Sequence, residues 1–178
     1  MADVKIRKLT YDDAEAYVKL NVDVWCVAFA NIMPKEVLEA RRQRQPAQIE
    51  NFPNRDVNKN GHIDYVAEVD GKVVGEMSGN ILSDKDIFKD QGMAELHALY
   101  IHPDFQHMGI GWKLVKAFEK DAKKLGAKQY VIGVLKANEK ARHAYEKYGG
   151  VLSDYKGFFE FGGHKFEEVY YIYNIKEN

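Results

Sequence analysis

Two glycines, Gly109 and Gly111, stand where an apolar run turns into an amphipathic segment. The run Leu96 to Ile101 is typical of a strand, and the residues after Gly111 are typical of a helix. Because glycine has no Cβ atom, the backbone N–H groups of such a turn can approach a ligand closely and point at it. The turn therefore favours an anion, most naturally a phosphate.

Two common phosphate-binding motifs do not fit this turn. A Gly-x-Gly-x-x-Gly pattern that starts at Gly109 needs a third glycine at the position of Leu114. A P-loop needs four residues between its glycines and then Lys followed by Ser or Thr, whereas Ile110 alone separates the glycines here. A dinucleotide fold and a P-loop nucleotide site are therefore excluded at this position.

The turn does match the acetyl-CoA-binding signature Gln/Arg-x-x-Gly-x-Gly/Ala, which is present as residues 106–111. Leu-Tyr-Ile-His-Pro at 99–103 stands before it, and a second block, Asn138 to Gly150, follows the next strand. With these blocks, the sequence resembles the GCN5-related N-acetyltransferase (GNAT) family over nearly the whole chain. The resemblance implies the GNAT fold and an acetyl-CoA-dependent N-acetyltransferase that uses acetyl-CoA as cosubstrate and needs no metal.

The resemblance also implies roles for individual residues. In the family, the turn binds the pyrophosphate of acetyl-CoA, the strand end before it pairs with the pantetheine arm, and the N–H of Ile101 stabilises the oxyanion. Tyr145 is implied as the general acid that protonates the CoA thiolate, and Asn138 as a contact of the pantetheine. The residues alone also permit an N-cap for Asn138 and a core-facing ring for Tyr145. The expected cofactor-binding residues are Leu99, Tyr100, Ile101, Gln106, His107, Met108, Gly109, Ile110, Gly111, Trp112, Asn138 and Tyr145.

A proton acceptor is needed too, because an alkylammonium must lose a proton before its nitrogen attacks a thioester. Strand alternation predicts that Glu95 and His97 share a face with Leu99 and Ile101, beside the acetyl group. Family members often carry a glutamate at the position of Glu95, so Glu95 is the expected base, with His97 or a water chain as alternatives. Cys26 lies in an apolar helical stripe, so we expect direct transfer without an acetyl-enzyme.

The acceptor is not identified by the sequence. In the family its pocket is shaped by the first two helices, the loop after them and the C-terminal hairpin, and here we expect Trp25, Phe29 and Glu95 to contact it. The partner is thus a small-molecule or peptide amine. The basic residues Arg41, Arg42 and Arg44 are most simply a solvated face; alternatively, they attract an anionic substrate or the cofactor phosphates.

A competing signal lies at residues 56–64, which match the first nine positions of an EF-hand calcium loop, with Gly61 at position six. Position twelve is Ala67 in place of the bidentate glutamate, and the following residues are typical of a strand. A polar turn stabilised by Asx side chains is the preferred interpretation. Besides the enzyme, two functions stay open: a non-catalytic acyl-CoA-binding module and a calcium-responsive interaction protein.

Hydrophobic periodicity predicts the order β-α-α-β-β-β-α-β-α-β-β. We expect one α/β domain over residues 1–178, with a mixed, largely antiparallel, twisted sheet of about seven strands and about four flanking helices. The predicted elements include helices from about Asp12 to Ala30 and from Lys35 to Arg44, and a hairpin that turns at Asp70-Gly71. Residues 83–92 are predicted to form a loop.

Composition excludes several classes of protein. The net charge of -1 argues against nucleic acid as the main partner, and a single cysteine excludes an intrachain disulfide. The first residues lack the apolar run of a signal peptide, and no segment is apolar over the length that a membrane span needs. We therefore expect a cytoplasmic protein that does not bind membranes; a homodimer is possible.

Overall fold

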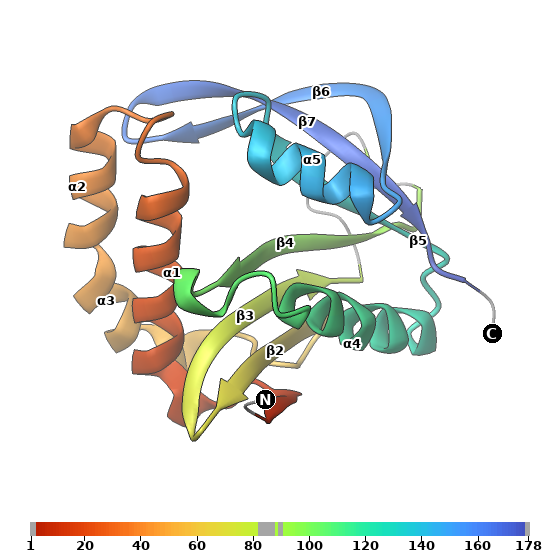
Figure 1. Ribbon diagram of the computed structural model, residues 1–178, viewed down its shortest axis with the longest axis horizontal. Helices are drawn as coiled ribbons and strands as arrows, with labels where there is room; N and C mark the ends of the chain where they lie inside the picture. The colour runs from red at the N-terminus through yellow and green to blue at the C-terminus, as the bar shows by residue number, and fades with distance from the viewer. Residues whose placement is uncertain (1–2, 82–87, 89–90, 177–178) are drawn as a thin grey trace.

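The computed structural model describes residues 3–81, 88 and 91–176. A seven-stranded sheet with the order β1-β2-β3-β4-β5-β7-β6 runs through it (Figure 1). Its strands are β1 (Val4–Lys8), β2 (His62–Val69), β3 (Lys72–Asn80), β4 (Ala94–Ile101), β5 (Gln129–Leu135), β6 (Val151–Phe161) and β7 (His164–Asn174). The helices are α1 (Ala14–Ala28), α2 (Lys35–Gln43), α3 (Gln45–Glu50), α4 (Ile110–Lys124) and α5 (Glu139–Lys147).

Neighbouring strands are antiparallel except for β4 and β5, which are parallel and joined by α4. The predicted mixed sheet is therefore confirmed, and so is the single parallel crossover. The β2–β3 hairpin turns at Asp70 and Gly71, both with positive φ, as an Asp-Gly hairpin turn requires. The two strands predicted after the last helix are β6 and β7, and the loop predicted at 83–92 lies largely outside the described residues.

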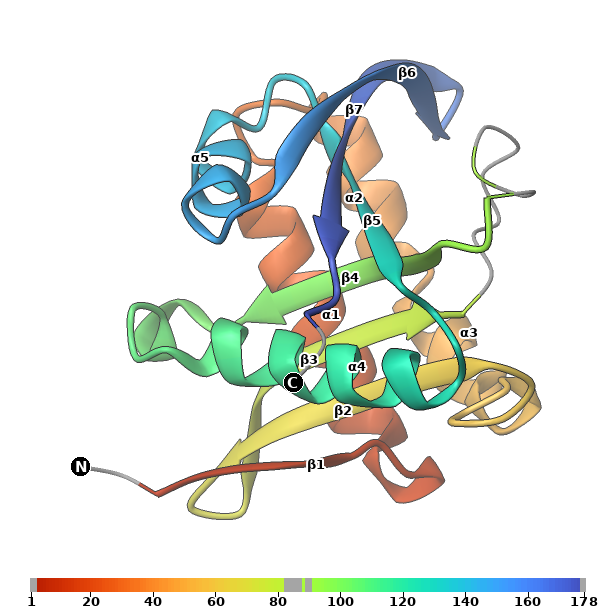
Figure 2. The same ribbon diagram turned by 90° about the vertical axis from the view of Figure 1, so that its right-hand side faces the viewer.

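Helices cover both faces of the sheet (Figure 2). One hydrophobic cluster joins α4 and α5 to one face, and a second joins α1, α2 and the segment after them to the other face. The helix α4 lies close to the sheet because Gly79 has no side chain: a Cβ atom there would come within 2.6 Å of the Phe118 ring. No helix in the described part of the chain is both long and apolar enough to cross a membrane.

The strands β4 and β5 separate soon after they meet. Their only paired positions are Ala94 with Tyr130 and Glu95 with Val131. Beyond them, β4 continues along β3 while β5 stays paired with β7 through its whole length. The C-terminal half of β4 therefore has a neighbouring strand on one side only.

The first helical turn is attached to the sheet through Arg7. Its guanidinium donates two hydrogen bonds of 2.8 Å to Asp13 and one of 2.8 Å to Glu68 on β2. Asp13 also accepts hydrogen bonds of 2.9 Å from the backbone N–H and the hydroxyl of Thr10, so its carboxylate reaches back to the N-cap residue as in a capping box. Arg7, with Thr10, lowers the pKa of Asp13 to about 2.

We expect Asp13→Asn to lower the free energy of unfolding by about 1–3 kcal/mol at neutral pH, because Arg7 loses its charged partner. Since the folded pKa lies below the unfolded value of about 3.9, this stabilisation is present above pH ~4 and is lost as the pH falls towards 2. Urea unfolding at pH 6 and at pH 2.5 measures both effects. The control Glu15→Gln removes an exposed i,i+4 ion pair and should change little. An Asp13→Asn deficit of equal size at both pH values would contradict this account.

Candidate active site

The glycine turn presents free backbone donors. Gly109 has φ of +74° and His107 has φ of +63°, so the chain turns sharply before α4 begins at Ile110. No described group accepts a hydrogen bond from the backbone amides of residues 107–112, as is usual for the first turn of a helix. The Gln106 side chain donates a 3.1 Å hydrogen bond to the Ile101 carbonyl oxygen, which attaches the turn to the end of β4. The turn can therefore bind an anion through several N–H groups.

The main chain of β4 offers a second set of polar groups. His102 donates a 2.8 Å hydrogen bond to the carbonyl oxygen of Val74 on β3. Because main-chain groups alternate in direction along a strand, those of Ile101 and Leu99 point away from β3, towards the side from which β5 has separated. An extended polar ligand could hydrogen-bond there as an added strand would.

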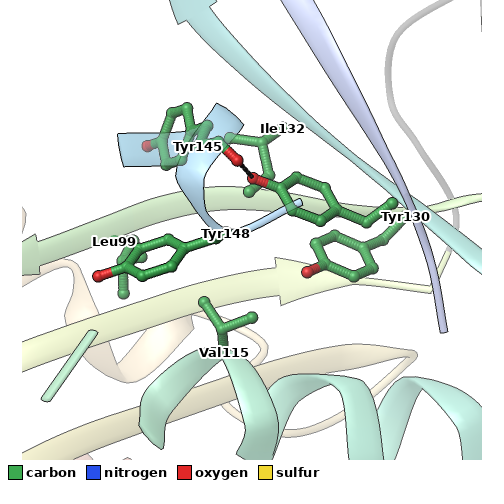
Figure 3. A pocket seen from close by; sticks show the side chains of 7 residues that line it. Leu99, Val115, Tyr130, Ile132, Tyr145 and Tyr148 are labelled. Carbon is green, nitrogen blue, oxygen red and sulfur yellow. Dashed lines mark hydrogen bonds between the residues drawn. The ribbon is translucent and has the colours of Figure 1, made fainter. Parts of the chain in front are cut away.

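Aromatic side chains surround the space between the separated strands (Figure 3). They come from β5, β7 and α5, while β4 and α4 contribute aliphatic side chains. The residues that line this narrow apolar hollow are Leu99, Val115, Tyr130, Ile132, Tyr145, Tyr148 and Tyr173. The end of β4 and α5, both predicted at the site, thus meet at this hollow, and Trp112 after the turn lies 5.4 Å from Tyr148 between ring centroids.

Tyr145 is positioned from β7. The hydroxyl of Tyr173 donates a 2.8 Å hydrogen bond to the backbone oxygen of Tyr145, and the Tyr171 hydroxyl donates one of 2.6 Å to Glu146 (Figure 3 shows the first). Asn138 caps α5 by accepting a 3.2 Å hydrogen bond from the Ala141 amide, which confirms the N-cap interpretation. Burial raises the pKa of Tyr145 to about 12, so its phenol keeps its proton at neutral pH and can donate it.

The predicted placement of Glu95 is wrong. The pairing of β4 with β3 shifts so that Gly79 faces Leu96 while Ser78 faces Ala98, which leaves His97 as an extra residue. Leu96, Leu99 and Ile101 consequently all face α4, and alternation puts Glu95 on the opposite face. Glu95 is buried, and its carboxylate lies 3.5 Å from Nδ1 of His97.

The aromatic residues expected to contact an acceptor are packed in the core. Trp25 lies 4.9 Å from Phe29 and 5.7 Å from Phe161 between ring centroids, and all but a small part of Trp25 and Phe29 is buried. Cys26 is buried as well, and its Sγ lies 3.7 Å from the Leu38 carbonyl oxygen. The thiol is thus enclosed as a small apolar side chain would be.

A second hollow, which we call the helix-side pocket, opens on the face opposite α4. Its volume is about 360 Å³. It is bounded by α1, α2, the segment from α3 to Arg55, and β3, through Tyr17, Val18, Asn21, Arg41, Gln48, Asn51, Phe52, Arg55 and Ser78. Most of these side chains are polar, in contrast to the aromatic hollow between β4 and β5.

A buried carboxylate, Glu76, lies on β3 beside this pocket. It is fully buried and accepts a 2.5 Å hydrogen bond from the Asn21 side chain, which in turn accepts one from Arg41. Burial raises the pKa of Glu76 to about 7, although the hydrogen bond from Asn21 and the nearby Tyr17 and Arg55 oppose this shift. Such a group can take up and release a proton near neutral pH.

Sequence reasoning missed Glu76 and Asn21. The only signal was a carboxylate within the strand-like run Val73 to Ser78 and an asparagine within the apolar stripe of the first helix. Alternation predicts that Glu76 and Ser78 share one face, but such a face is usually exposed to solvent. Here helices cover it, which turns a polar strand face into the wall of a pocket.

The calcium-like loop uses its ligand side chains internally. Arg55 donates a 2.6 Å hydrogen bond to Asp64, whose other carboxylate oxygen accepts one of 3.2 Å from the Asn58 amide. Asp56 accepts a 3.1 Å hydrogen bond from Asn60. The loop leads directly into β2 and not into a helix. The loop is therefore a polar turn held by Arg55. The positive charge of Arg55 repels a divalent cation.

Comparisons with known proteins agree with this geometry. A family model described as "Acetyltransferase (GNAT) family" matches residues 27–150. The spermidine N(1)-acetyltransferase of Thermoplasma acidophilum is 27% identical over 157 residues, which cover 86% of this chain and 92% of that protein.

Solved structures share the fold. The PaiA N-acetyltransferase of Thermoplasma acidophilum, in complex with coenzyme A, has a TM-score of 0.72 at 24% identity and covers 94% of this chain and 98% of its own. A GCN5-related N-acetyltransferase of Rhodopseudomonas palustris has a TM-score of 0.74 at 21% identity, with 98% and 97% of the two chains covered. The predicted fold is confirmed by these likenesses.

We expect calorimetric titration with calcium to give no heat above dilution, because Arg55 already neutralises Asp64 and Ala67 offers no bidentate carboxylate. A calcium chelator titrated in the same buffer serves as the positive control. Saturable heat at one calcium ion per chain would contradict this expectation.

Proposed function

The chain belongs to the acetyltransferase (GNAT) family, and on this premise we propose that it transfers the acetyl group of acetyl-CoA directly to a primary amine of a small molecule or a peptide N-terminus. One observation carries the proposal: the free amides of residues 107–112 follow the C-terminal half of β4, which has a neighbouring strand on one side only. A site for an anion thus follows a strand edge with free hydrogen-bonding groups. This combination suits a thioester that carries phosphates and a long polar arm.

In the proposed complex, the amides from His107 to Trp112 hold the pyrophosphate of acetyl-CoA. The helix dipole of α4 adds favourable charge at the same point. The main-chain groups of Leu99 and Ile101 hydrogen-bond the pantetheine arm, with Tyr100 between them on the opposite face. The N–H of Ile101 then stabilises the negative charge that develops on the thioester oxygen.

Three proton transfers complete the proposed reaction. A base takes a proton from the acceptor ammonium, the free amine forms the N–C bond, and the C–S bond breaks. Tyr145 protonates the departing thiolate and regains a proton from the new amide nitrogen. The resemblance assigns the base to Glu95, at the last β4–β5 pair, and the buried Glu76 on β3 is the second candidate.

The acceptor class is open at this level. The name of the Thermoplasma acidophilum relative puts spermidine, a polyamine, among the candidates. A non-catalytic acyl-CoA-binding module would bind the cofactor and leave its thioester intact. Release of the CoA thiol therefore distinguishes the enzyme from the binding module.

We expect the protein to release free CoA thiol from acetyl-CoA in the presence of an acceptor amine, and Tyr145→Phe to lower kcat by ~10²-fold or more, because the thiolate loses its proton donor. The assay is thiol release against a panel of polyamines, amino acids, amino acid amides and short peptides. The affinity of the variant for CoA should match that of the wild type. CoA binding without thiol release on any amine would support the binding module instead.

The glycine turn can be tested with a matched pair of variants. Gly109 and Gly126 both have positive φ, and a Cβ atom on either would meet no atom within 4 Å. Alanine at either position should cost about 1 kcal/mol in unfolding free energy, because the left-handed conformation is strained for it. Only Gly109→Ala should weaken CoA binding in calorimetry. Equal CoA affinity of the two variants would count against a cofactor site at the turn.

A further inference from the structure

The helix-side pocket gathers buried polar atoms that lack partners. Among the described residues, four buried side-chain polar atoms have no hydrogen-bond partner, and two of them, Nε of Arg41 and Oε1 of Gln48, belong to residues that line this pocket. A third, Oε2 of Glu76, lies in the second layer, because the other oxygen of that carboxylate accepts its hydrogen bond from the lining residue Asn21. Buried polar groups in folded proteins are nearly always paired. Their concentration around one hollow of about 360 Å³ points to a ligand that supplies the missing partners.

The missing partners define the chemistry of that ligand. The oxygens of Gln48 and Glu76 need hydrogen-bond donors, which an ammonium group provides. The N–H of Arg41 needs an acceptor oxygen. No described carboxylate lies within ion-pair distance of Arg41, whereas Arg55 is neutralised by the fully buried Asp64 at 2.6 Å.

Resting on the proposed acetyl transfer, we propose that the helix-side pocket is the acceptor site for a monoamine that carries a carbonyl or carboxylate oxygen, with its ammonium at Glu76 and its oxygen at Arg41. Amino acids, their amides and peptide N-termini have this combination of groups. A polyamine does not, since its second ammonium would meet the guanidinium of Arg41 without any carboxylate to screen it.

The pocket adjoins the proposed reaction centre through Tyr100. Glu76 on β3 is the register partner of Tyr100 on β4 (Figure 1 shows the two strands beside α1). The pKa of Tyr100 is raised by burial first and then by the charges of Glu76 and Tyr145, while Arg41 lowers it. Tyr100 also follows Leu99, which lines the hollow between β4 and β5, so the strand pair that carries Glu76 reaches the edge of that hollow.

In this arrangement Glu76, and not Glu95, takes the first proton. The ammonium gives one proton to the Glu76 carboxylate, and the neutral nitrogen forms the bond to the thioester carbon. When the C–S bond breaks, Tyr145 gives its proton to sulfur and recovers one from the amide nitrogen. The proton on Glu76 leaves to solvent, so one proton is released in each turnover.

The groups around Glu76 set its titration. They are Asn21 and Tyr17 on α1, Arg55 at the pocket edge, Asp64 on β2 and Tyr100 on β4. Since catalysis requires ionised Glu76, kcat/KM should rise with pH through about 7. In Glu76→Gln this rise of kcat/KM near pH 7 should disappear. The pH dependence that remains should be that of the ionisation of the acceptor amine.

The first experiment uses the wild type alone. Thiol release is measured with acetyl-CoA and four acceptors: glycinamide, a dipeptide, putrescine and spermidine. We expect kcat/KM for glycinamide or the dipeptide to exceed that for either polyamine by at least ~10-fold, the effect of one charged hydrogen bond. A preference for polyamines overturns the acceptor assignment while the proposed acetyl transfer stands. No release with any acceptor overturns both.

The second experiment uses paired variants. Glu76→Gln should lower kcat by ~10²-fold or more, and Arg41→Gln should raise KM for glycinamide by at least ~10-fold. The controls Glu39→Gln and Arg42→Gln lie on the outer face of α2 and should behave as the wild type. Unchanged CoA affinity of each variant verifies that it is folded.

Two results would overturn the assignment and leave the proposed function intact. In one, Glu76→Gln keeps the wild-type pH profile of kcat/KM, while Glu95→Gln loses the rise of kcat/KM near pH 7. In the other, Arg41→Gln changes KM for glycinamide and for putrescine by the same factor. Two results together support the assignment. Glu76→Gln loses the rise of kcat/KM near pH 7, and Arg41→Gln raises KM only for amines that carry an oxygen.

Discussion

The separation of β4 from β5 is the constraint on which the rest of the molecule depends. Each strand is paired along its length on its outer side, β4 with β3 and β5 with β7, but the two meet at only two positions. The sheet is therefore two rigid halves joined at a short contact. Main-chain groups at the end of β4 lack strand partners, and the aromatic side chains of β5, β7 and α5 fill the opening from one side.

The two faces of the sheet carry polar groups of different kinds. On the α4 side, the glycine turn and the apolar hollow suit a long ligand with an anionic end. On the α1 side, the guanidinium of Arg41, whose Nε has no partner, and the amide of Gln48 line a polar pocket, with the buried carboxylate of Glu76 behind Asn21. Burying such groups is unfavourable in the free protein, since desolvation favours the neutral form of Glu76. A bound amine would relieve that cost, so affinity and selectivity would come from the same side chains.

Much of this could be predicted from local pattern. The hairpin at Asp70-Gly71, the helix after Gly111 and the cap at Asn138 are as predicted, because turns, caps and apolar stripes depend on neighbouring residues. The predicted face of Glu95 was wrong, because one extra residue at His97 reverses the alternation along β4. Nothing in the local sequence pattern marks this extra residue. The prediction of a solvated face was wrong for Arg41, which is half-buried and donates a hydrogen bond to Asn21 on α1.

By itself, the sequence determined the element order, the glycine turn before α4 and the family, since these rest on residue types at short spacing. Only the tertiary structure decided that α1, α2 and α3 cover the polar face of β3, so that Asn21, Arg41 and Glu76, far apart in the chain, form one hydrogen-bonded row. Strand alternation says which side chains share a face. What lies against that face is decided by packing between segments that are distant in the chain. At β3 that packing buries the carboxyl group of Glu76.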